Sequence, residues 1–217
     1  MTIDGAARRM RHRMLKVYKE CDPLAERGAA KMHATCTRGC AACCRLLVMA
    51  SLAEAVTIAI YLLSDPEWRA ELPAFRERIE AHILAYNDPE LTVGSHFDKQ
   101  LPCVFLGADE TCRIYSVRPA HCRYHYVVSD PRNCSFGADD PVTARINLDS
   151  LRNHVLDAAV TAAPPGGRMF LAPLPVIVYT ALVMLSSDEA NFTELLGHDV
   201  PRRVLDLRAW IHLERDM

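Results

Sequence analysis

The sequence predicts a mainly α-helical fold, a helical bundle with a small cysteine-bearing β-hairpin and loop region. Apolar residues recur at three- and four-residue steps over most of the chain, which is the spacing of amphipathic helices. Between Asn87 and Pro141 this spacing gives way to short runs broken by proline, glycine and aspartate. The 217 residues are 50% apolar and 24% charged, an ordinary globular composition, so we expect a single domain over residues 1–217.

Two helices are predicted ahead of the first cysteines. Met10, Met14 and Val17 recur at helical spacing in the first of them. Asp22 is a favoured N-cap residue and Pro23 a favoured first helical residue. A second helix is therefore expected to begin at this point.

Further helices are predicted after the first cysteines. Ser51 and Glu54 have the spacing of a capping box, and the apolar stripe that follows predicts a helix ending near Ser64. A new helix is expected to begin near Pro66, and apolar residues continue at helical spacing beyond it. Pro73 is expected to interrupt this next helix, because proline lacks the backbone N–H that a helix interior uses.

A short β-hairpin is predicted inside the loop region. Residues 103–106 and 111–115 form two short runs, each with one cysteine, around a turn that begins at Gly107. An isolated hairpin is marginally stable in water. A bound metal is therefore expected to stabilise it.

The C-terminal part, residues 143–217, is predicted to be helical. Apolar stripes predict helices over residues 148–159, 176–186, 188–196 and 202–214. The most apolar stretch, residues 170–185, is shorter than the ~20 residues that span a bilayer and contains two prolines. We therefore expect a buried helix there and no membrane contact.

Nine cysteines are many for a chain expected in a reducing compartment, where disulfides seldom persist. Their odd number also excludes complete pairing. Eight of them fall in two loop-like windows, and a C-x3-C-x2-C-C spacing lets several thiolates reach one metal centre. We predict a metal-binding region over residues 36–134 with the candidate ligands Cys36, Cys40, Cys43, Cys44, Cys103, Cys112, Cys122 and Cys134.

Three cysteines call for separate interpretation. Neighbouring side chains tend to point apart, so Cys43 and Cys44 are expected to differ in role. Either one binds metal while the other packs, or each serves a different metal. Cys21 lies on a helical face and is expected in the core.

Two histidines and two arginines surround the later cysteines. On a helix, His121 and His125 would face one site, where either one could replace a sulfur ligand. Arg118 and Arg123 would donate hydrogen bonds to cluster sulfur or to a carboxylate, or else form ordinary salt bridges.

Charge and the N-terminal sequence limit the classes of partner. A formal net charge of -2 predicts no nucleic-acid-binding surface. The basic run over residues 8–13 is expected to be a solvated helix face. The first residues lack the apolar segment of a secretory signal, so we expect a cytoplasmic protein.

The cysteine blocks resemble a known family. The run Cys36-Thr-Arg-Gly-Cys40-Ala-Ala-Cys43-Cys44 is followed by Leu101-Pro-Cys103-Val-Phe-Leu and by Cys112-Arg-Ile-Tyr-Ser-Val-Arg118-Pro119-Ala-His-Cys122-Arg123. These blocks are similar to the YkgJ-type cysteine cluster family, which implies a zinc- or iron-chelating domain over roughly residues 36–134. A related cysteine pattern occurs in flagellin lysine N-methylase, which resembles an iron–sulfur protein that uses S-adenosylmethionine. The family label implies C-x2-C-x2-C-C, whereas the first gap here is three residues.

Two functions of different class explain the cysteines. An iron–sulfur cluster with a redox or modifying role is favoured, because there are more thiolates than one structural zinc needs. The alternative is a structural zinc-binding module that mediates protein interaction. A P-loop, G-x-S-x-G and G-x-G-x-x-G are all absent from the sequence, so catalytic residues stay unassigned and the enzyme question open. A protein partner or substrate is expected, without an indication of its identity.

Overall fold

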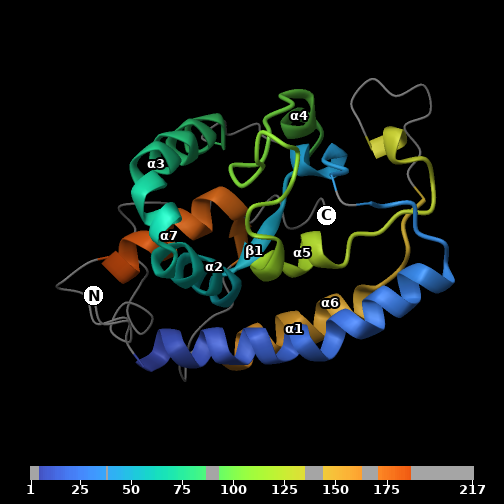
Figure 1. The fold of residues 1–217 in the computed structure, drawn as a ribbon, viewed down its shortest axis with the longest axis horizontal. Helices are drawn as coiled ribbons and strands as arrows, with labels where there is room; N and C mark the ends of the chain where they lie inside the picture. Colours follow the sequence, from blue (N-terminus) through green and yellow to red (C-terminus); the bar gives the residue numbers. More distant parts are fainter. Residues whose placement is uncertain (1–4, 38, 87–92, 135–143, 163–170, 187–217) are drawn as a thin grey trace.

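The computed structural model describes residues 5–37, 39–86, 93–134, 144–162 and 171–186. Most of these residues are helical, which confirms the predicted mainly α class (Figure 1). The helices are α1 (Gly5–Lys31), α2 (Leu52–Ser64), α3 (Pro66–Tyr86), α4 (Val93–Asp98), α5 (Ala120–Arg123), α6 (Asp149–Ala162) and α7 (Leu174–Ser186). The shorter elements are the 3₁₀ turns η1 (Ala42–Arg45), η2 (Tyr115–Val117) and η3 (Pro131–Cys134) and the strands β1 (Met49–Ser51) and β2 (Leu171–Pro173).

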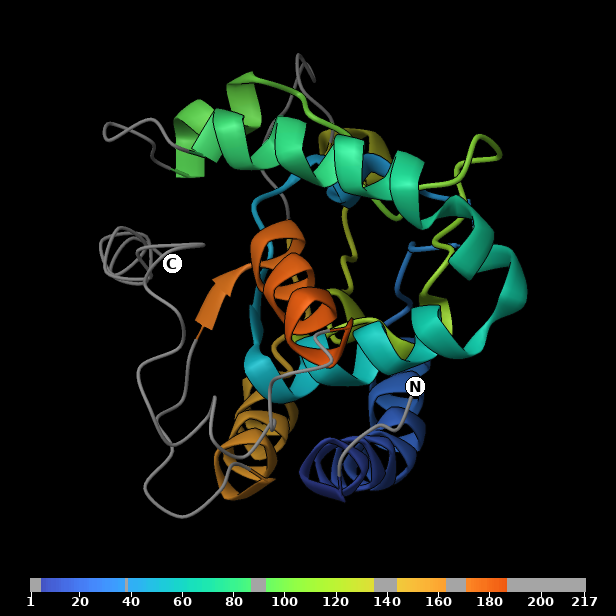
Figure 2. The ribbon, with the colours of Figure 1, turned by 90° about the vertical axis from the view of Figure 1, so that its left-hand side faces the viewer.

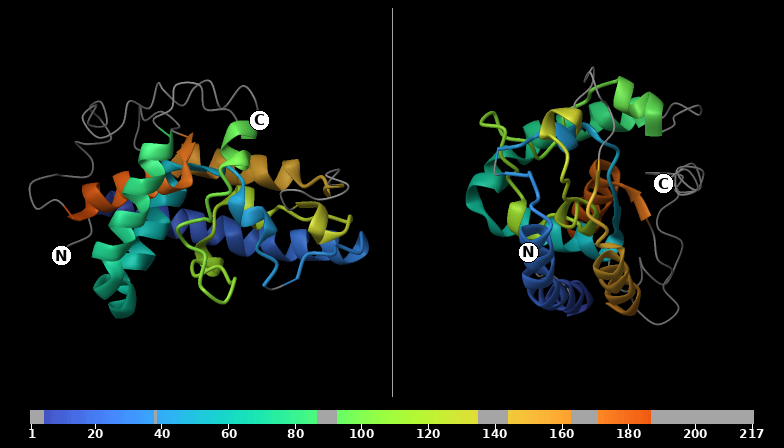
Figure 3. Two further views of the ribbon diagram at one scale, coloured as in Figure 1. Left: turned by 90° about the horizontal axis from the view of Figure 1, so that it is seen from above. Right: turned by 90° about the vertical axis from the view of Figure 1, so that its right-hand side faces the viewer.

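The helices pack in two groups around α2. Helices α1 and α6 lie side by side along one face of the molecule, and both contact α2 (Figures 1 and 3). Beyond α2, helix α7 packs against both α2 and α3 (Figure 2). Every residue of α2 from Leu52 to Ile60 is buried, as expected of a helix with neighbours on all sides.

Helix α1 is continuous through Pro23, so the predicted second helix starting there is wrong. A proline inside a helix removes one backbone hydrogen bond and costs about 3 kcal/mol. Packing offsets that cost here, because the buried stripe continues through Cys21 and Ala25 on both sides of the proline. Asp22, the predicted cap of the second helix, instead lies inside α1. Its carboxylate accepts a hydrogen bond from Nη1 of Arg123 at 2.7 Å.

Helix α3 likewise continues through Pro73, contrary to the predicted interruption. Two buried aromatic rings, Trp68 and Phe75, lie on either side of the proline and meet edge to face at 5.5 Å between centroids. Both rings also contact Phe105 of the loop region, with centroids 6.3 and 5.1 Å away. This aromatic contact stabilises the helical course on both sides of Pro73.

The predicted capping box at the start of α2 is confirmed. The backbone N–H of Ser51 donates to Oε2 of Glu54 at 2.8 Å, and the N–H of Glu54 donates to Oγ of Ser51 at 3.3 Å. The helix ends at Ser64, as predicted.

The carboxylate of Glu54 also joins α2 to two other helices. Its Oε1 accepts the backbone N–H of Ala120 at 2.7 Å and the hydroxyl of Tyr18 at 3.3 Å. Glu54 is only 1% exposed, so these donors replace the water that a carboxylate otherwise needs. The start of α5 and the middle of α1 are therefore positioned by a side chain of α2.

The β-structure is small, as predicted, and has two parts. Strands β1 and β2 pair antiparallel, with Met49 opposite Pro173 and Ser51 opposite Leu171. The predicted cysteine-bearing hairpin is present as a single antiparallel bridge between Leu106 and Cys112. The regular sheet thus forms between segments distant in sequence.

The C-terminal predictions divide between described and undescribed residues. The helices predicted over residues 148–159 and 176–186 are confirmed as α6 and α7. Those predicted over residues 188–196 and 202–214 lie outside the described residues. Among the described helices, none combines the length and apolar character needed to cross a membrane.

We predict that Glu54→Ala lowers the free energy of unfolding by about 3 kcal/mol or more, because it leaves the buried N–H groups of Ser51 and Ala120 and the Tyr18 hydroxyl without their acceptor. Urea unfolding followed by circular dichroism measures the change. The control is Glu20→Ala on the exposed face of α1, where the carboxylate lies 4.0 Å from Nζ of Lys16 and the pair contributes under about 1 kcal/mol. A loss in Glu54→Ala no larger than in the control would contradict this prediction.

Candidate metal centre

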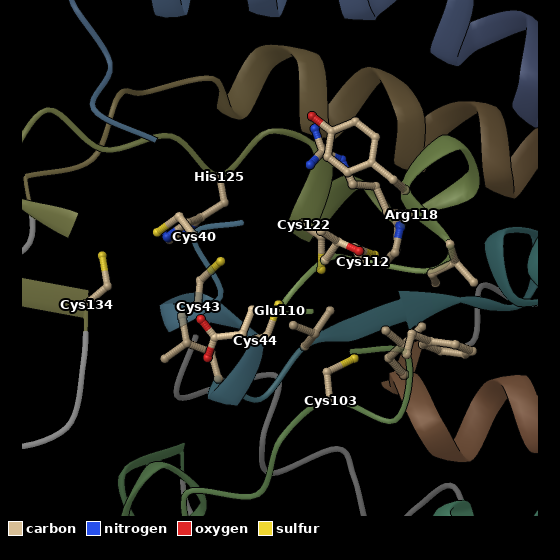
Figure 4. A pocket seen from close by; sticks show the side chains of 18 of the residues that line it. Cys40, Cys43, Cys44, Cys103, Glu110, Cys112, Arg118, Cys122, His125 and Cys134 are labelled. Atoms are coloured by element: carbon tan, nitrogen blue, oxygen red, sulfur yellow. The ribbon is translucent and has the colours of Figure 1, made fainter. Parts of the chain in front are cut away.

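A cavity of about 410 Å³ lies between the first cysteine loop, the hairpin and α5. Cysteine side chains surround it from several segments of the chain (Figure 4). All eight predicted ligands line it, namely Cys36, Cys40, Cys43, Cys44, Cys103, Cys112, Cys122 and Cys134. Cys21 lies elsewhere, 2% exposed among residues of α1 and α6, which confirms its predicted place in the core.

The first cysteine loop, residues 35–45, is held by the segment that follows α5. The N–H of Thr35 donates to the carbonyl of Val127 at 2.9 Å, and the N–H of Val127 donates to Sγ of Cys36 at 3.4 Å. Gly39 has a φ of +86°, which glycine adopts without steric cost. The loop can therefore reverse direction between Cys36 and Cys40.

The turn η1 presents two adjacent cysteines to the cavity. A 3₁₀ turn has about three residues per turn, so neighbouring side chains diverge less than they do in a strand. Cys43 and Cys44 both line the cavity, and the expected difference in their roles stays a prediction. Their thiols share a hydrogen bond.

The hairpin brings Cys103 and Cys112 to the same cavity, one from each arm. The N–H of Cys103 donates to the carbonyl of Cys44 at 2.7 Å, which joins the hairpin directly to η1. The antiparallel bridge to Leu106 places Cys112 across from the first arm.

Cys122 and Cys134 complete the wall. Pro119 disfavours a helical conformation in the residue before it, so Arg118 is extended and α5 begins only after Pro119. The N–H of Cys122 donates to the carbonyl of Pro119 at 3.0 Å within the first turn. Cys134 ends η3, which packs against η1.

The two predicted histidines lie in different places. Helix α5 ends at Arg123, so His121 and His125 are not on one helix face, and the expectation that both face one site is wrong. His125 lines the cavity (Figure 4). The Nδ1 atom of His121 lies 2.7 Å from the carbonyl of Met49, where it acts as a donor.

Two further histidines, His82 and His96, line the cavity and were not predicted to do so. They come from α3 and α4, outside the cysteine windows, and are 8% and 1% exposed. The Nε2 atom of His82 donates to the carbonyl of Pro102 at 3.0 Å, next to Cys103. A single histidine on a helix gives no sequence signal for such a position.

Burial disfavours the thiolate form of three cavity cysteines. It raises the pKa of Cys103 to about 12 and raises those of Cys112 and Cys122. For Cys43 the hydrogen bond with Cys44 is the larger cause, followed by burial. A metal that binds these sulfurs therefore has to displace protons.

The two arginines near the cysteines have different environments. Arg123 is 6% exposed and donates to Asp22, which is the ordinary salt bridge predicted as one alternative. Arg118 lines the cavity, and its positive charge opposes the rise in pKa of Cys36, Cys43, Cys112 and Cys122.

Four of the thiols influence one another's pKa through their charges. Within the set Cys43, Cys103, Cys112 and Cys122, which we term the inner cysteine set, negative charge on one sulfur raises the pKa of another in every pair. Soft sulfur donors suit zinc, copper(I) or iron–sulfur clusters, whereas calcium and magnesium need oxygen. Glu110 is the one carboxylate among the described residues that line the cavity. The donor set therefore fits a thiophilic metal.

The thiols stand around the cavity, not around one point. In the described ranges, no group of three or more histidine, cysteine or acidic residues is placed to hold a single metal ion. A tetrahedral zinc site needs its sulfurs about 3.8 Å apart, given Zn–S bonds of ~2.3 Å. A single ion would therefore require the thiols to move inward.

A helical protein with a cysteine-lined cavity is thus the class that fold and site define. Residues 35–137, just under half of the chain, match the family model CxxCxxCC, described as "Putative zinc- or iron-chelating domain". This region is therefore similar to that cysteine cluster family, in agreement with the resemblance of its motifs, and the match supports metal binding as its function class. Neither a curated protein nor a solved structure matches the chain.

We predict that Cys103→Ala and Cys122→Ala lower both bound metal and thermal stability, because each removes a buried thiol of the inner cysteine set. Elemental analysis and thermal unfolding measure the two quantities. The matched control is Cys21→Ala, which leaves the metal bound because that thiol is buried outside the cavity. Unchanged metal stoichiometry in the two cavity variants would refute their assignment as ligands.

Proposed function

We propose that the cavity holds an iron–sulfur cluster bound by the inner cysteine set, and that the protein acts through this cluster in a redox or modifying role. One observation carries the proposal. Eight thiols line a single cavity of about 410 Å³, yet no three of the described candidate donors are placed around one ion. The proposal includes a cytoplasmic location, where thiols stay reduced, and an unidentified protein partner or substrate.

Cluster geometry supports iron–sulfur over a single zinc ion. In a [4Fe–4S] cluster each thiolate binds a different iron, and in a [2Fe–2S] cluster the four thiolates are divided between two irons, so the sulfurs as a set stand farther apart than around one tetrahedral ion. Thiols spread around a cavity match that requirement better than a convergent set does. The remaining four cysteines are then available around the cluster without being ligands to it.

The chain's own residues would hold the cluster, shield it and balance its charge. Cys43, Cys103, Cys112 and Cys122 would bind from η1, the hairpin and α5. Leu46 and Val48 are among the apolar side chains that line the cavity and exclude water from it. When bound, such a cluster supplies single-electron transfer, and its potential depends on nearby charge and solvent exposure.

A structural zinc module is the second candidate, and the loop architecture favours it. The first cysteine loop and the hairpin are irregular, and the backbone hydrogen bond from Cys103 to Cys44 ties them together. A zinc ion shared by both segments would stabilise this region without chemistry of its own. The region would then serve as a surface for a protein partner.

We predict that protein purified without oxygen contains iron and sulfide and absorbs broadly near ~400 nm, as sulfur-to-iron charge transfer requires. Oxygen is excluded because recombinant zinc can replace a cluster lost in air. Elemental analysis with an ultraviolet–visible spectrum tests this directly. Colourless protein with zinc alone at integral stoichiometry would exclude the cluster and favour the structural module.

A further inference from the structure

Arg118 differs in its contacts from four other arginines of the described ranges. Arg113, Arg123, Arg132 and Arg152 each form an ion pair with a carboxylate. No carboxylate in those same ranges forms an ion pair with Arg118. Its Nε atom is buried without a hydrogen-bond acceptor among the described residues.

Two aromatic residues fix the guanidinium of Arg118. Its Cζ atom lies 3.9 Å from the centroid of the Tyr115 ring, a close cation–π contact. Its charge also opposes the rise that burial causes in the pKa of Tyr126. Both tyrosines line the same cavity, and Pro119 holds the Arg118 backbone extended. The positive charge thus has a stacking partner, and no carboxylate of the described residues forms an ion pair with it.

The groups that face this charge are sulfurs. Arg118 lies near Cys112 and Cys122 in Figure 4, on the side of the cavity away from Cys134. Its charge also acts on Cys36 and Cys43, across the cavity. Four segments of the chain, the first loop, η1, the hairpin and α5, therefore each place a cysteine at the cavity that Arg118 also lines.

A partly buried cation without a counter-ion is costly, unless negative charge arrives when the site is filled. Thiolates that bind a metal supply such charge, because four of them outweigh a divalent ion. An anionic substrate is a different source of negative charge. We favour the thiolate centre as the source of this charge, because the cavity that Arg118 lines is also lined by cysteine sulfurs.

We propose that Arg118 is the counter-ion of the metal–thiolate centre, a positioning residue that strengthens metal binding and sets the electron affinity of the centre. This inference rests on the proposed function, since it requires a thiolate-bound metal in the cavity. In this role Arg118 acts through its charge and is not a ligand of the metal. The charge favours the thiolate form of the sulfurs and the more negative, reduced state of a cluster.

The test compares Arg118→Met, Arg118→Lys and Arg113→Met in full-length protein purified without oxygen. Arg118→Met removes the charge and keeps much of the side-chain volume, whereas Arg118→Lys keeps the charge. Arg113→Met is the matched control, because Arg113 also stacks on an aromatic ring, Trp68 at 4.0 Å, but is paired with Glu71 at 2.6 Å. Two quantities are measured for each, the retention of bound iron or zinc against a chelator and, for iron, the midpoint reduction potential.

We expect Arg118→Met to weaken metal retention on the order of tenfold, because one positive charge near the sulfurs is lost. For a cluster, its midpoint potential shifts to a lower value. Arg118→Lys restores both quantities, and Arg113→Met leaves both at the wild-type value. A merely structural role would lower the melting temperature without moving the potential, and lysine would not restore it.

The outcomes separate this inference from the function it rests on. Protein that binds thiolate-coordinated metal, but whose Arg118→Met variant matches wild type in retention and in potential, overturns the role of Arg118 and leaves the proposed centre standing. Protein without any thiolate-bound metal overturns both. Loss of retention in Arg118→Met and Arg118→Lys alike, with the potential unchanged, indicates a packing role and also overturns the inference.

Discussion

At the first turn of α2, the buried carboxylate of Glu54 accepts hydrogen bonds from three segments of the chain. Its partners are the Ser51 backbone and hydroxyl, the Ala120 backbone and the Tyr18 hydroxyl. Breaking such a network leaves polar groups buried without partners, which costs several times more than an exposed hydrogen bond contributes. The carboxylate therefore fixes where α5 begins relative to α1 and α2. Cys122 lies in α5 and Arg118 precedes it, so the inner wall of the cavity depends on the same interaction.

The cavity itself is built by loops that the helices hold apart. Helices α2, α3 and α7 and the aromatic contact of Trp68 and Phe75 with Phe105 set the distance between the hairpin and the core. Within that frame, hydrogen bonds from Cys103 to Cys44 and from Val127 to Cys36 bring the cysteine segments together. Loops that are joined by few backbone hydrogen bonds gain much of their stability from whatever they bind. Stability and metal binding are thus coupled through the same residues.

Electrostatics gives the cavity its character. Burial raises the pKa of Cys103, Cys112 and Cys122, and each inner cysteine makes charge on the others less favourable. Arg118 acts in the opposite direction from within the same wall. An environment of this kind disfavours isolated thiolates and favours a set of thiolates neutralised together by metal. That balance is consistent with the metal binding that the family match supports.

By itself, the sequence determined the helical class, the capping box of α2, the core position of Cys21 and the family of the cysteine region. Each of these depends on residues close together in the chain or on residue type alone. Only the tertiary structure decided that α1 and α3 continue through Pro23 and Pro73, because packing on both sides of each proline offsets a lost hydrogen bond. It alone placed His125, His82 and His96 at the cavity and turned His121 towards Met49, and it paired Arg123 with Asp22 while leaving Arg118 among the sulfurs. These features depend on contacts between residues far apart in sequence. The local spacing of residues does not determine which distant group a side chain will contact.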